Sequence, residues 1–293
     1  MHAAALPLSV SLAVLAAAVT HATWNAIAHG MKDQVLAFGL IGAGSIAVAV
    51  PLAALAPFPL GRCWPYLLGS VFIHVFYNLL LMRSYRYGEF GQVYPLARGT
   101  SPLVVTVLAA VFAAERPSVP AVFGVLVISG GLTVLVFAGR RSRSGEGPGP
   151  GPSRAALVAA GATGLTIAAY TTVDGLGVRL SGSSAGYIAW LMLLESLCVP
   201  AWALVRRRRE VVSGASRRVL LSGVSAGALA VLAYGLVLWA QTRGALAPIA
   251  ALRETSVIFG AIIGTVVFRE PFGRSRIAAT VLVVIGVLLL NVA

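Results

Sequence analysis

The feature that most constrains this chain is a succession of long apolar stretches separated by short polar breaks. A helix that crosses a bilayer needs about 20 mainly apolar residues. Ten stretches of this kind cover roughly residues 6–28, 35–56, 65–86, 91–113, 119–138, 155–177, 184–205, 218–241, 245–268 and 274–292. Because backbone groups in lipid must be satisfied within the segment, such stretches predict helices. We therefore expect an all-α membrane protein with ten transmembrane helices.

The composition excludes the main alternatives. The chain is 58% hydrophobic and only 11% charged, whereas about a quarter of the residues in a soluble domain are charged. A water-soluble globule and a disordered chain are both excluded. The two cysteines form no disulfide framework, and no metal-ligand spacing occurs. We expect no cofactor and no bound metal.

One segment differs from all the others and divides the chain near its middle. Residues 139–153, GRRSRSGEGPGPGPS, are rich in Gly, Pro, Ser and Arg, which predicts a flexible, solvated linker. The linker separates a first part, residues 1–138, from a second, residues 154–293, with five predicted spans on each side.

The two parts contain a repeated pattern at a constant offset of 155 residues. The offset aligns Arg98 with Arg253, Thr100 with Thr255, Ser101 with Ser256, Glu115 with Glu270, and Gly131 with Gly286. Because each repeat has an odd number of spans, the second copy must enter the membrane from the opposite side. Inverted five-helix repeats are characteristic of secondary transporters, whose substrate site lies near the midplane between the repeats.

These residues resemble the drug/metabolite transporter superfamily, specifically its EamA-type ten-helix members. The resemblance is carried by HATWN in the first stretch, PLARGTSPL in the fourth, LRETSVIFG in the ninth, and the acids that follow the last two, Glu115 and Glu270. It implies a non-enzymatic exporter or exchanger of small metabolites or drugs. Such a protein works by alternating access between two EamA-like repeats, often with ion coupling. It names no single substrate, and it leaves a homodimer open.

Two arginines inside the membrane, Arg98 and Arg253, are the first candidate site residues, because ionisable groups at this depth usually serve a function. Lining a central cavity, they would clamp a carboxylate or phosphate. Alternatively, each would bond helix carbonyls or an acid such as Glu254 and brace the packing of the repeats. Glu254 adjoins Arg253, and neighbours at i and i+1 do not face each other on a helix, so we expect Glu254 to point elsewhere.

Glu195 is the candidate for proton coupling. It lies near the centre of the seventh stretch, where burial disfavours the charged form of a carboxyl group. Such an acid can take up and release a proton, as coupled exchange requires. The alternative is a salt bridge to Arg98 or Arg253, and both roles can alternate during transport.

The first and third stretches share a polar pattern that predicts a cavity wall. A histidine, an aromatic residue and an asparagine follow one another at i, i+3 and i+4 on one helical face. The alternatives are interfacial aromatic belts and helix–helix hydrogen bonds. The two trios are His21, Trp24 and Asn25, and His74, Tyr77 and Asn78; further expected wall residues are Tyr94, Tyr170, Thr171, Tyr234, Trp239 and Gln241. We expect Asp174, near an end of the sixth stretch, to meet lipid headgroups.

The distribution of basic residues predicts an orientation. In a soluble protein a net charge of +13 would suggest nucleic acid as a partner, but 16 of the 22 Lys and Arg fall in the odd-numbered loops and four in the even-numbered loops. The positive-inside rule then places both termini outside and the linker in the cytoplasm. Family members are usually drawn the other way round.

The function predicted from the sequence is secondary active transport of a small solute by an integral protein of the plasma (inner) membrane. The partners we expect are that solute and the lipid bilayer, with no nucleic acid. The alternatives are a flippase for a lipid-linked headgroup and, less favoured, a polytopic membrane enzyme. Enzymatic chemistry commonly needs clustered acids or a base beside a nucleophile, and the loops contain no such cluster.

Overall fold

The structure is a computed structural model that describes residues 6–31, 33–87, 90–138, 154–213, 216–267 and 274–292. Within these residues it consists of helices joined by short loops, without a β-strand. The helices are α1 (Leu8–His29), α2 (Gln34–Leu55), the 3-10 helix η1 (Gly61–Cys63), α3 (Trp64–Tyr87), α4 (Phe90–Phe112), α5 (Val119–Ala138), α6 (Arg154–Leu180), α7 (Ser184–Ser213), α8 (Arg217–Gln241), α9 (Leu246–Arg253), α10 (Ser256–Val266) and α11 (Arg274–Val292).

Length and hydropathy support the membrane assignment. In the described part of the chain, six segments are long and apolar enough to cross a bilayer: Leu8–His29, Val35–Leu55, Gly61–Leu80, Ser184–Trp202, Arg217–Gln241 and Leu246–Val266. Shorter apolar helices cover Arg98–Phe112, Val119–Val134 and Ile277–Leu290. The predicted class, an all-α membrane protein, is confirmed. The count of ten spans stays a prediction.

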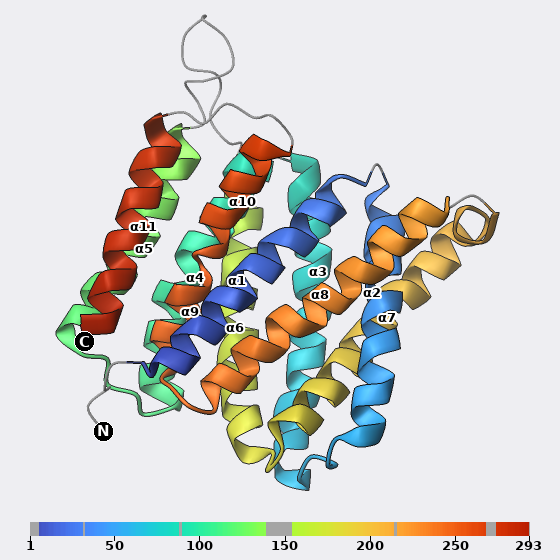
Figure 1. Cartoon of the computed structure of the whole chain (residues 1–293), viewed down its shortest axis with the longest axis horizontal. Helices are drawn as coiled ribbons and strands as arrows, with labels where there is room; N and C mark the ends of the chain where they lie inside the picture. The colour runs from blue at the N-terminus through green and yellow to red at the C-terminus, as the bar shows by residue number, and fades with distance from the viewer. Residues whose placement is uncertain are drawn as a thin grey trace, which may run out of the picture.

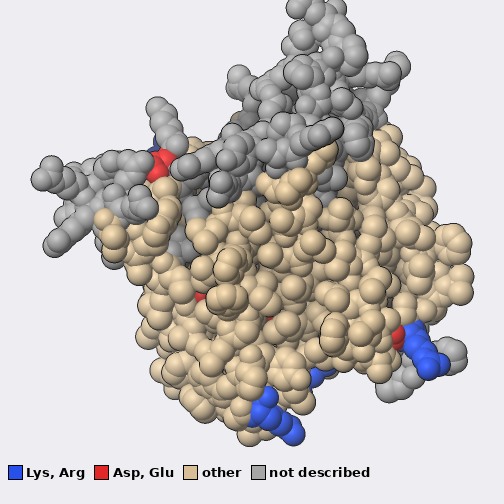
Figure 2. All heavy atoms as spheres, turned by 180° about the vertical axis from the view of Figure 1, so that it is seen from behind, with Lys and Arg blue, Asp and Glu red and all other residues tan. Residues whose placement is uncertain are grey.

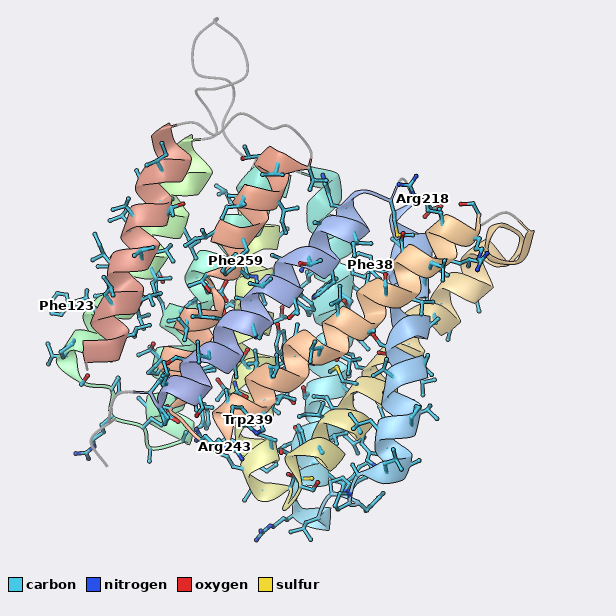
Figure 3. All side chains as sticks on the ribbon, viewed as in Figure 1. Phe38, Phe123, Arg218, Trp239, Arg243 and Phe259 are labelled. Atoms are coloured by element: carbon cyan, nitrogen blue, oxygen red, sulfur yellow. The ribbon has the colours of Figure 1, made fainter. Side chains whose placement is uncertain are left out.

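The outer surface fits a lipid environment. Large apolar side chains point outward, such as Phe123 on α5 (Figure 3), which is 57% exposed. Val266 on α10 is 73% exposed. Uncharged residues cover almost all of the described middle of the face in Figure 2, and the exposed basic residues of that face lie along its lower edge. A surface of this kind is unfavourable in water and suits the hydrocarbon core of a bilayer.

The helices alternate in direction across the molecule (Figure 1). The helix ends that adjoin the even-numbered loops lie at the lower edge of that view, and those that adjoin the odd-numbered loops lie at the upper edge. We call these the even-loop edge and the odd-loop edge. The helix α1 packs against α8, and α3 packs against α6. The helices α2 and α7 form a pair at one end of the bundle, and α5 and α11 form a pair at the other.

Glycines let two of these helix pairs approach at backbone distance. A Cβ atom placed on Gly227 of α8 would lie 2.5 Å from the backbone nitrogen of Ser45 on α2. One placed on Gly124 of α5 would lie 2.8 Å from the carbonyl oxygen of Gly286 on α11. Small residues commonly serve this purpose between membrane helices. Gly124 and Gly286 are thus used for packing within the chain.

The ninth predicted span is not one continuous helix. The helix α9 ends at Arg253 and α10 begins at Ser256. At the break, the backbone N–H groups of Glu254 and Thr255 bond the carbonyls three residues earlier, and the Thr255 hydroxyl donates to the Leu252 carbonyl at 2.8 Å. A threonine hydroxyl that competes for a backbone carbonyl in this way loosens a helix.

Candidate functional site

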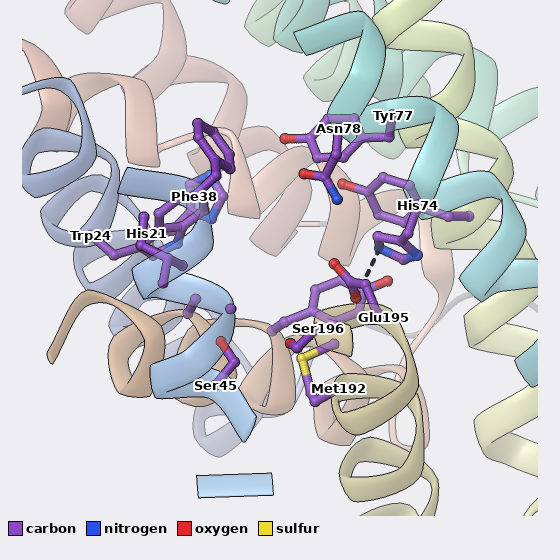
Figure 4. A pocket seen from close by; sticks show the side chains of 15 residues that line it. His21, Trp24, Phe38, Ser45, His74, Tyr77, Asn78, Met192, Glu195 and Ser196 are labelled. Atoms are coloured by element: carbon purple, nitrogen blue, oxygen red, sulfur yellow. Dashed lines mark ion pairs between the residues drawn. The ribbon is translucent and has the colours of Figure 1, made fainter. Parts of the chain in front are cut away.

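A cavity lies between the helices of both halves, from the middle of the bundle toward the odd-loop edge. Side chains of α3 and α7 form one wall, and those of α1 and α2 face them across the space (Figure 4). The cavity encloses about 110 Å³, which is small beside the roughly 300–1,000 Å³ of typical ligand sites. The residues that line it are His21, Trp24, Phe38, Ile41, Gly42, Ser45, His74, Tyr77, Asn78, Tyr170, Met192, Glu195, Ser196, Ala230 and Tyr234.

Many of the residues proposed from the sequence line this cavity. Both trios contribute: His21 and Trp24 come from α1, and all three members of the second trio come from α3. The helical spacing gathers the second trio on one face, as expected. The others proposed from the sequence are Tyr170 on α6, Glu195 on α7 and Tyr234 on α8.

The acid in the cavity wall is Glu195, and its nearest ionisable partner is His74. Their closest atoms, Glu195 Oε2 and His74 Nε2, are 3.8 Å apart. The Glu195 side chain is 20% exposed, and Oε2 is buried without a hydrogen bond to the described residues. The His74 ring stacks on Tyr170, with 4.0 Å between the centroids. The contact with His74 replaces the salt bridge to Arg98 or Arg253 that the sequence left open.

The two arginines lie outside the cavity wall, in a buried cluster around Glu254. Arg98 Nη1 donates to Glu254 Oε1 at 3.1 Å, and Arg98 Nη2 contacts His21 Nε2. Arg253 Nε lies 3.7 Å from the same oxygen. We call Arg98, Arg253 and Glu254 the arginine knot. It ties α4 to the break between α9 and α10.

Two expectations about the arginines change as a result. Each arginine is only 3% exposed, so neither faces a solute in this conformation, and the geometry agrees with the bracing alternative. The expectation that Glu254 points away from Arg253 was wrong. The rule for neighbouring residues holds in a continuous helix, whereas the helix stops between these two side chains.

Four other predicted wall residues also lie outside the cavity lining. Asn25 turns back and donates to the His21 carbonyl at 2.8 Å. Thr171 is fully buried, and Trp239 stacks under the Arg243 guanidinium, 4.1 Å from ring centroid to carbon, near the even-loop edge (Figure 3). Gln241 is buried beside Thr171, toward whose carbonyl its amide points at 3.4 Å. The Tyr94 side chain lies outside the described residues, as does Glu270.

The sequence reasoning missed the apolar and hydroxyl part of the wall. In an apolar stretch, the pattern predicts only lipid-facing or packing positions for Phe38, Met192 and Ala230. Ser45 and Ser196 gave a weak signal as hydroxyls well inside their spans. The full set of missed residues is Phe38, Ile41, Gly42, Ser45, Met192, Ser196 and Ala230.

Asp174 does not meet headgroups, and that expectation was wrong. It is completely buried. The Tyr187 hydroxyl donates to Asp174 Oδ1 at 2.9 Å, and the Tyr234 hydroxyl donates to Oδ2. The helix α6 continues to Leu180, so Asp174 lies well inside it. Because Tyr234 also lines the cavity, Asp174 sits directly behind the cavity wall.

Interlocking loops close the even-loop edge. Arg179 Nη2 pairs with Glu115 Oε1 at 3.0 Å and donates to the Gly244 carbonyl at 2.8 Å. The Glu115 carboxylate accepts from the backbone N–H of Leu246, the first residue of α9, at 2.8 Å. We call Glu115, Arg179, Gly244 and Leu246 the edge lock. It joins loops from both halves.

Comparison with known proteins agrees with this picture. Residues 154–292 match the EamA-like transporter family. A solved structure described only as a protein crystal structure superposes with a TM-score of 0.70, covers 97% of this chain and 95% of its own, and shares 16% sequence identity. At this identity the likeness shows the fold alone. No curated protein sequence matches the chain.

The match to the EamA-like transporter family covers residues 154–292 and is the finding that suggests a membrane transporter. The chain contains an EamA-like transporter domain, which confirms the resemblance to the EamA-type members of the drug/metabolite transporter superfamily.

Proposed function

We propose that this protein is a secondary active transporter that exchanges a small organic solute for protons by alternating access. The observation that carries the proposal is the cavity in the middle of an EamA-like bundle, with the carboxyl group of Glu195 in its wall. An ionisable residue that faces a cavity inside the membrane marks a substrate or proton pathway.

The walls favour a small solute with a positive or neutral polar group. Aromatic rings such as Trp24, Phe38 and Tyr77 surround the space, and Glu195 is the acid among the lining residues. Aromatic faces and a carboxylate together attract an ammonium group. The arginine knot lies outside the lining, so a carboxylate or phosphate would find no guanidinium there in this conformation.

The packing supports alternating access between inverted repeats. Under the repeat, the first five spans correspond to the last five, so the pair α1–α8 corresponds to the pair α6–α3, and both pairs are in contact. The pairs α2–α7 and α5–α11 each correspond to themselves, because the repeat relates the two helices within each pair. The edge lock closes one side, and the cavity lies toward the other. Combined with the charge bias, this conformation would be open to the cytoplasm, with both termini outside.

Uptake into liposomes tests the proposal. Purified protein in vesicles of phosphatidylethanolamine and phosphatidylglycerol is given radiolabelled phenethylamine, with phenylacetate as the anionic counterpart, with and without a pH gradient. We expect gradient-driven uptake of the amine alone. Glu195→Gln should abolish the gradient effect, whereas Glu195→Asp should retain part of it.

A matched exchange controls for the loss of a carboxyl group. Glu210→Gln alters an acid in the basic run that follows the seventh span and should transport like the wild type. Normal gradient-driven uptake by Glu195→Gln would refute the coupling role of Glu195. Uptake that is independent of the pH gradient in every variant would mean that the protein transports the amine without proton coupling. A reporter fused after Ala293 that is active only in the cytoplasm would overturn the proposed orientation.

A further inference from the structure

A string of polar groups leads from the cavity toward the even-loop edge. It begins at the contact between Glu195 Oε2 and His74 Nε2 (Figure 4). On the other side of the imidazole ring, His74 Nδ1 lies 3.1 Å from Ser70 Oγ and 3.0 Å from the Ser70 carbonyl oxygen. The Ser70 hydroxyl in turn donates to Asp174. Four residues on three helices thus connect the cavity acid to a second, fully buried acid.

The carbonyl contact fixes the proton on the His74 ring. A carbonyl oxygen only accepts, so Nδ1 must carry the hydrogen that faces Ser70. In the neutral ring, Nε2 then presents its lone pair to Glu195. A protonated Glu195 therefore faces an acceptor, and the opposite ring nitrogen faces the next member of the string.

Asp174 has the surroundings of an acid that changes its protonation state. Its hydrogen-bond donors are three hydroxyl groups, those of Ser70, Tyr187 and Tyr234. No lysine or arginine pairs with it among the described residues. Within the string, the charge of Asp174 acts on Glu195, and from outside it the charge of Arg253 acts on His74. Buried acids without a cationic partner are costly in the charged form.

We propose that Asp174 is a second proton-carrying site and that His74 and Ser70 pass protons between it and Glu195. The proposal rests on the coupling role of Glu195 given above. In the forward step, the Glu195 carboxyl gives its proton to His74 Nε2. His74 Nδ1 gives its proton to Ser70 Oγ, and the former Ser70 proton passes to the Asp174 carboxylate.

The charges balance in this step. Glu195 ends as a carboxylate, Asp174 ends protonated, and His74 stays neutral with its hydrogen moved from Nδ1 to Nε2. Transfer in the reverse direction, from Asp174 through Ser70 and His74 to Glu195, restores the first arrangement. Each forward step moves one proton away from the cavity.

The far end of the string is sealed in this conformation. Tyr187 is fully buried and packs in an apolar cluster with Cys63, Leu67 and Val178, each at most 2% exposed. A proton therefore reaches Asp174 from the cavity and stays there until the even-loop edge opens. The string would carry the proton between the two access states, while the solute moves through the cavity.

Infrared spectroscopy tests the string without any solute. The sequence contains only two aspartates, Asp33 and Asp174, so carbon-13 aspartate shifts the carboxylic-acid band of these two alone, and Asp33→Asn leaves Asp174 as the labelled acid. On acidification of the purified protein we expect two buried carboxylic-acid bands, a labelled one from Asp174 and an unlabelled one that Glu195→Gln removes.

Rates after a pH jump test the relay itself. The Asp174 band should rise more slowly in Ser70→Ala, which retains Asp174 and both tyrosines, and in Glu195→Gln. Ser129→Ala, a buried serine on α5 away from the string, should behave like the wild type. A labelled band that never appears, or one that rises equally fast in all variants, would overturn the relay.

The relay and the proposed function can fail separately. If the relay is absent, Glu195→Gln still abolishes gradient-driven uptake of phenethylamine in liposomes, while Asp174→Asn retains it. If the proposed coupling is absent, Glu195→Gln takes up the amine normally, whatever the spectra show. With both correct, Glu195→Gln and Asp174→Asn each lose the gradient effect.

Discussion

The arginine knot and the cavity wall both hold charged groups inside the membrane, yet they are built in opposite ways. In the knot, Glu254 is fully buried and lies 3.1 Å from Arg98 and 3.7 Å from Arg253. In the cavity, Glu195 is partly exposed and lies 3.8 Å from a histidine. A tightly paired, inaccessible charge holds helices together, whereas a loosely paired, accessible one can change its charge state. The difference identifies which acids are free to take part in transport.

The largest expected effect comes from breaking the knot. Arg98→Ala leaves Glu254 with a weaker partner in a dry site, and removal of one member of a buried pair costs about 3–5 kcal/mol. We expect a marked loss of folded protein, measured by thermal unfolding and size-exclusion chromatography in detergent. The double variant Arg98→Ala with Glu254→Ala should recover part of the loss. Normal folding combined with lost solute binding would instead return Arg98 to the binding site.

The same substitution in the two regions should give different results. Glu254→Gln removes the shared counter-charge of two arginines, and we expect it to destabilise the protein by roughly 1–3 kcal/mol. Glu195→Gln removes a partly exposed carboxyl that lacks a cationic partner, so its unfolding temperature should equal or exceed that of the wild type. Equal destabilisation by both changes would remove the distinction between the knot and the cavity.

A smaller effect is expected at the cavity wall. Trp24→Ala removes an aromatic face, and a cation–π contact contributes about 0.5–2 kcal/mol. Phenethylamine binding, measured by scintillation proximity, should weaken by up to roughly thirtyfold, with little change in unfolding temperature. Trp202→Ala, which alters a tryptophan that is 36% exposed on α7, serves as the control. Equal losses of affinity in both variants would place the amine elsewhere.

The smallest effect on stability is expected at the edge lock. The Arg179 side chain is 30% exposed, and exposed ion pairs contribute about 0–1 kcal/mol. Arg179→Lys should therefore leave the unfolding temperature within a degree or two, as such small free-energy changes do. A cysteine-labelling probe on the even-loop edge should become more reactive, because the edge opens more often. Unchanged labelling would mean that the apolar core alone keeps this edge closed.

Sequence alone predicted the helical class, the paired arginines and much of the cavity wall. Helical spacing placed His74, Tyr77 and Asn78 on one face, and the constant offset identified Arg98 and Arg253. The sequence did not distinguish the arginine knot from the cavity wall, because this distinction depends on which helix each side chain contacts. Apolar wall residues such as Phe38 carry no signal, since an apolar side chain suits lipid, core and cavity equally.

Two errors had a local cause. The apolar pattern predicts an end at residue 177 and so places Asp174 near a terminus, whereas α6 runs to Leu180. The break after Arg253 was invisible because its turn contains neither glycine nor proline, the usual signals of interruption. Hydroxyl groups and tertiary contacts produce the break instead, and these become visible only in the folded chain.

The interrupted helix also affects the charge of its own surroundings. A helix carries about half a positive elementary charge at its first residue and half a negative one at its last. Arg253 occupies the last turn of α9, the negative end, and Glu254 precedes the first turn of α10, the positive end. Each side chain therefore lies beside a backbone dipole of the opposite sign. A continuous helix would offer neither, so the interruption itself helps to hold two guanidinium groups and one carboxylate in the interior.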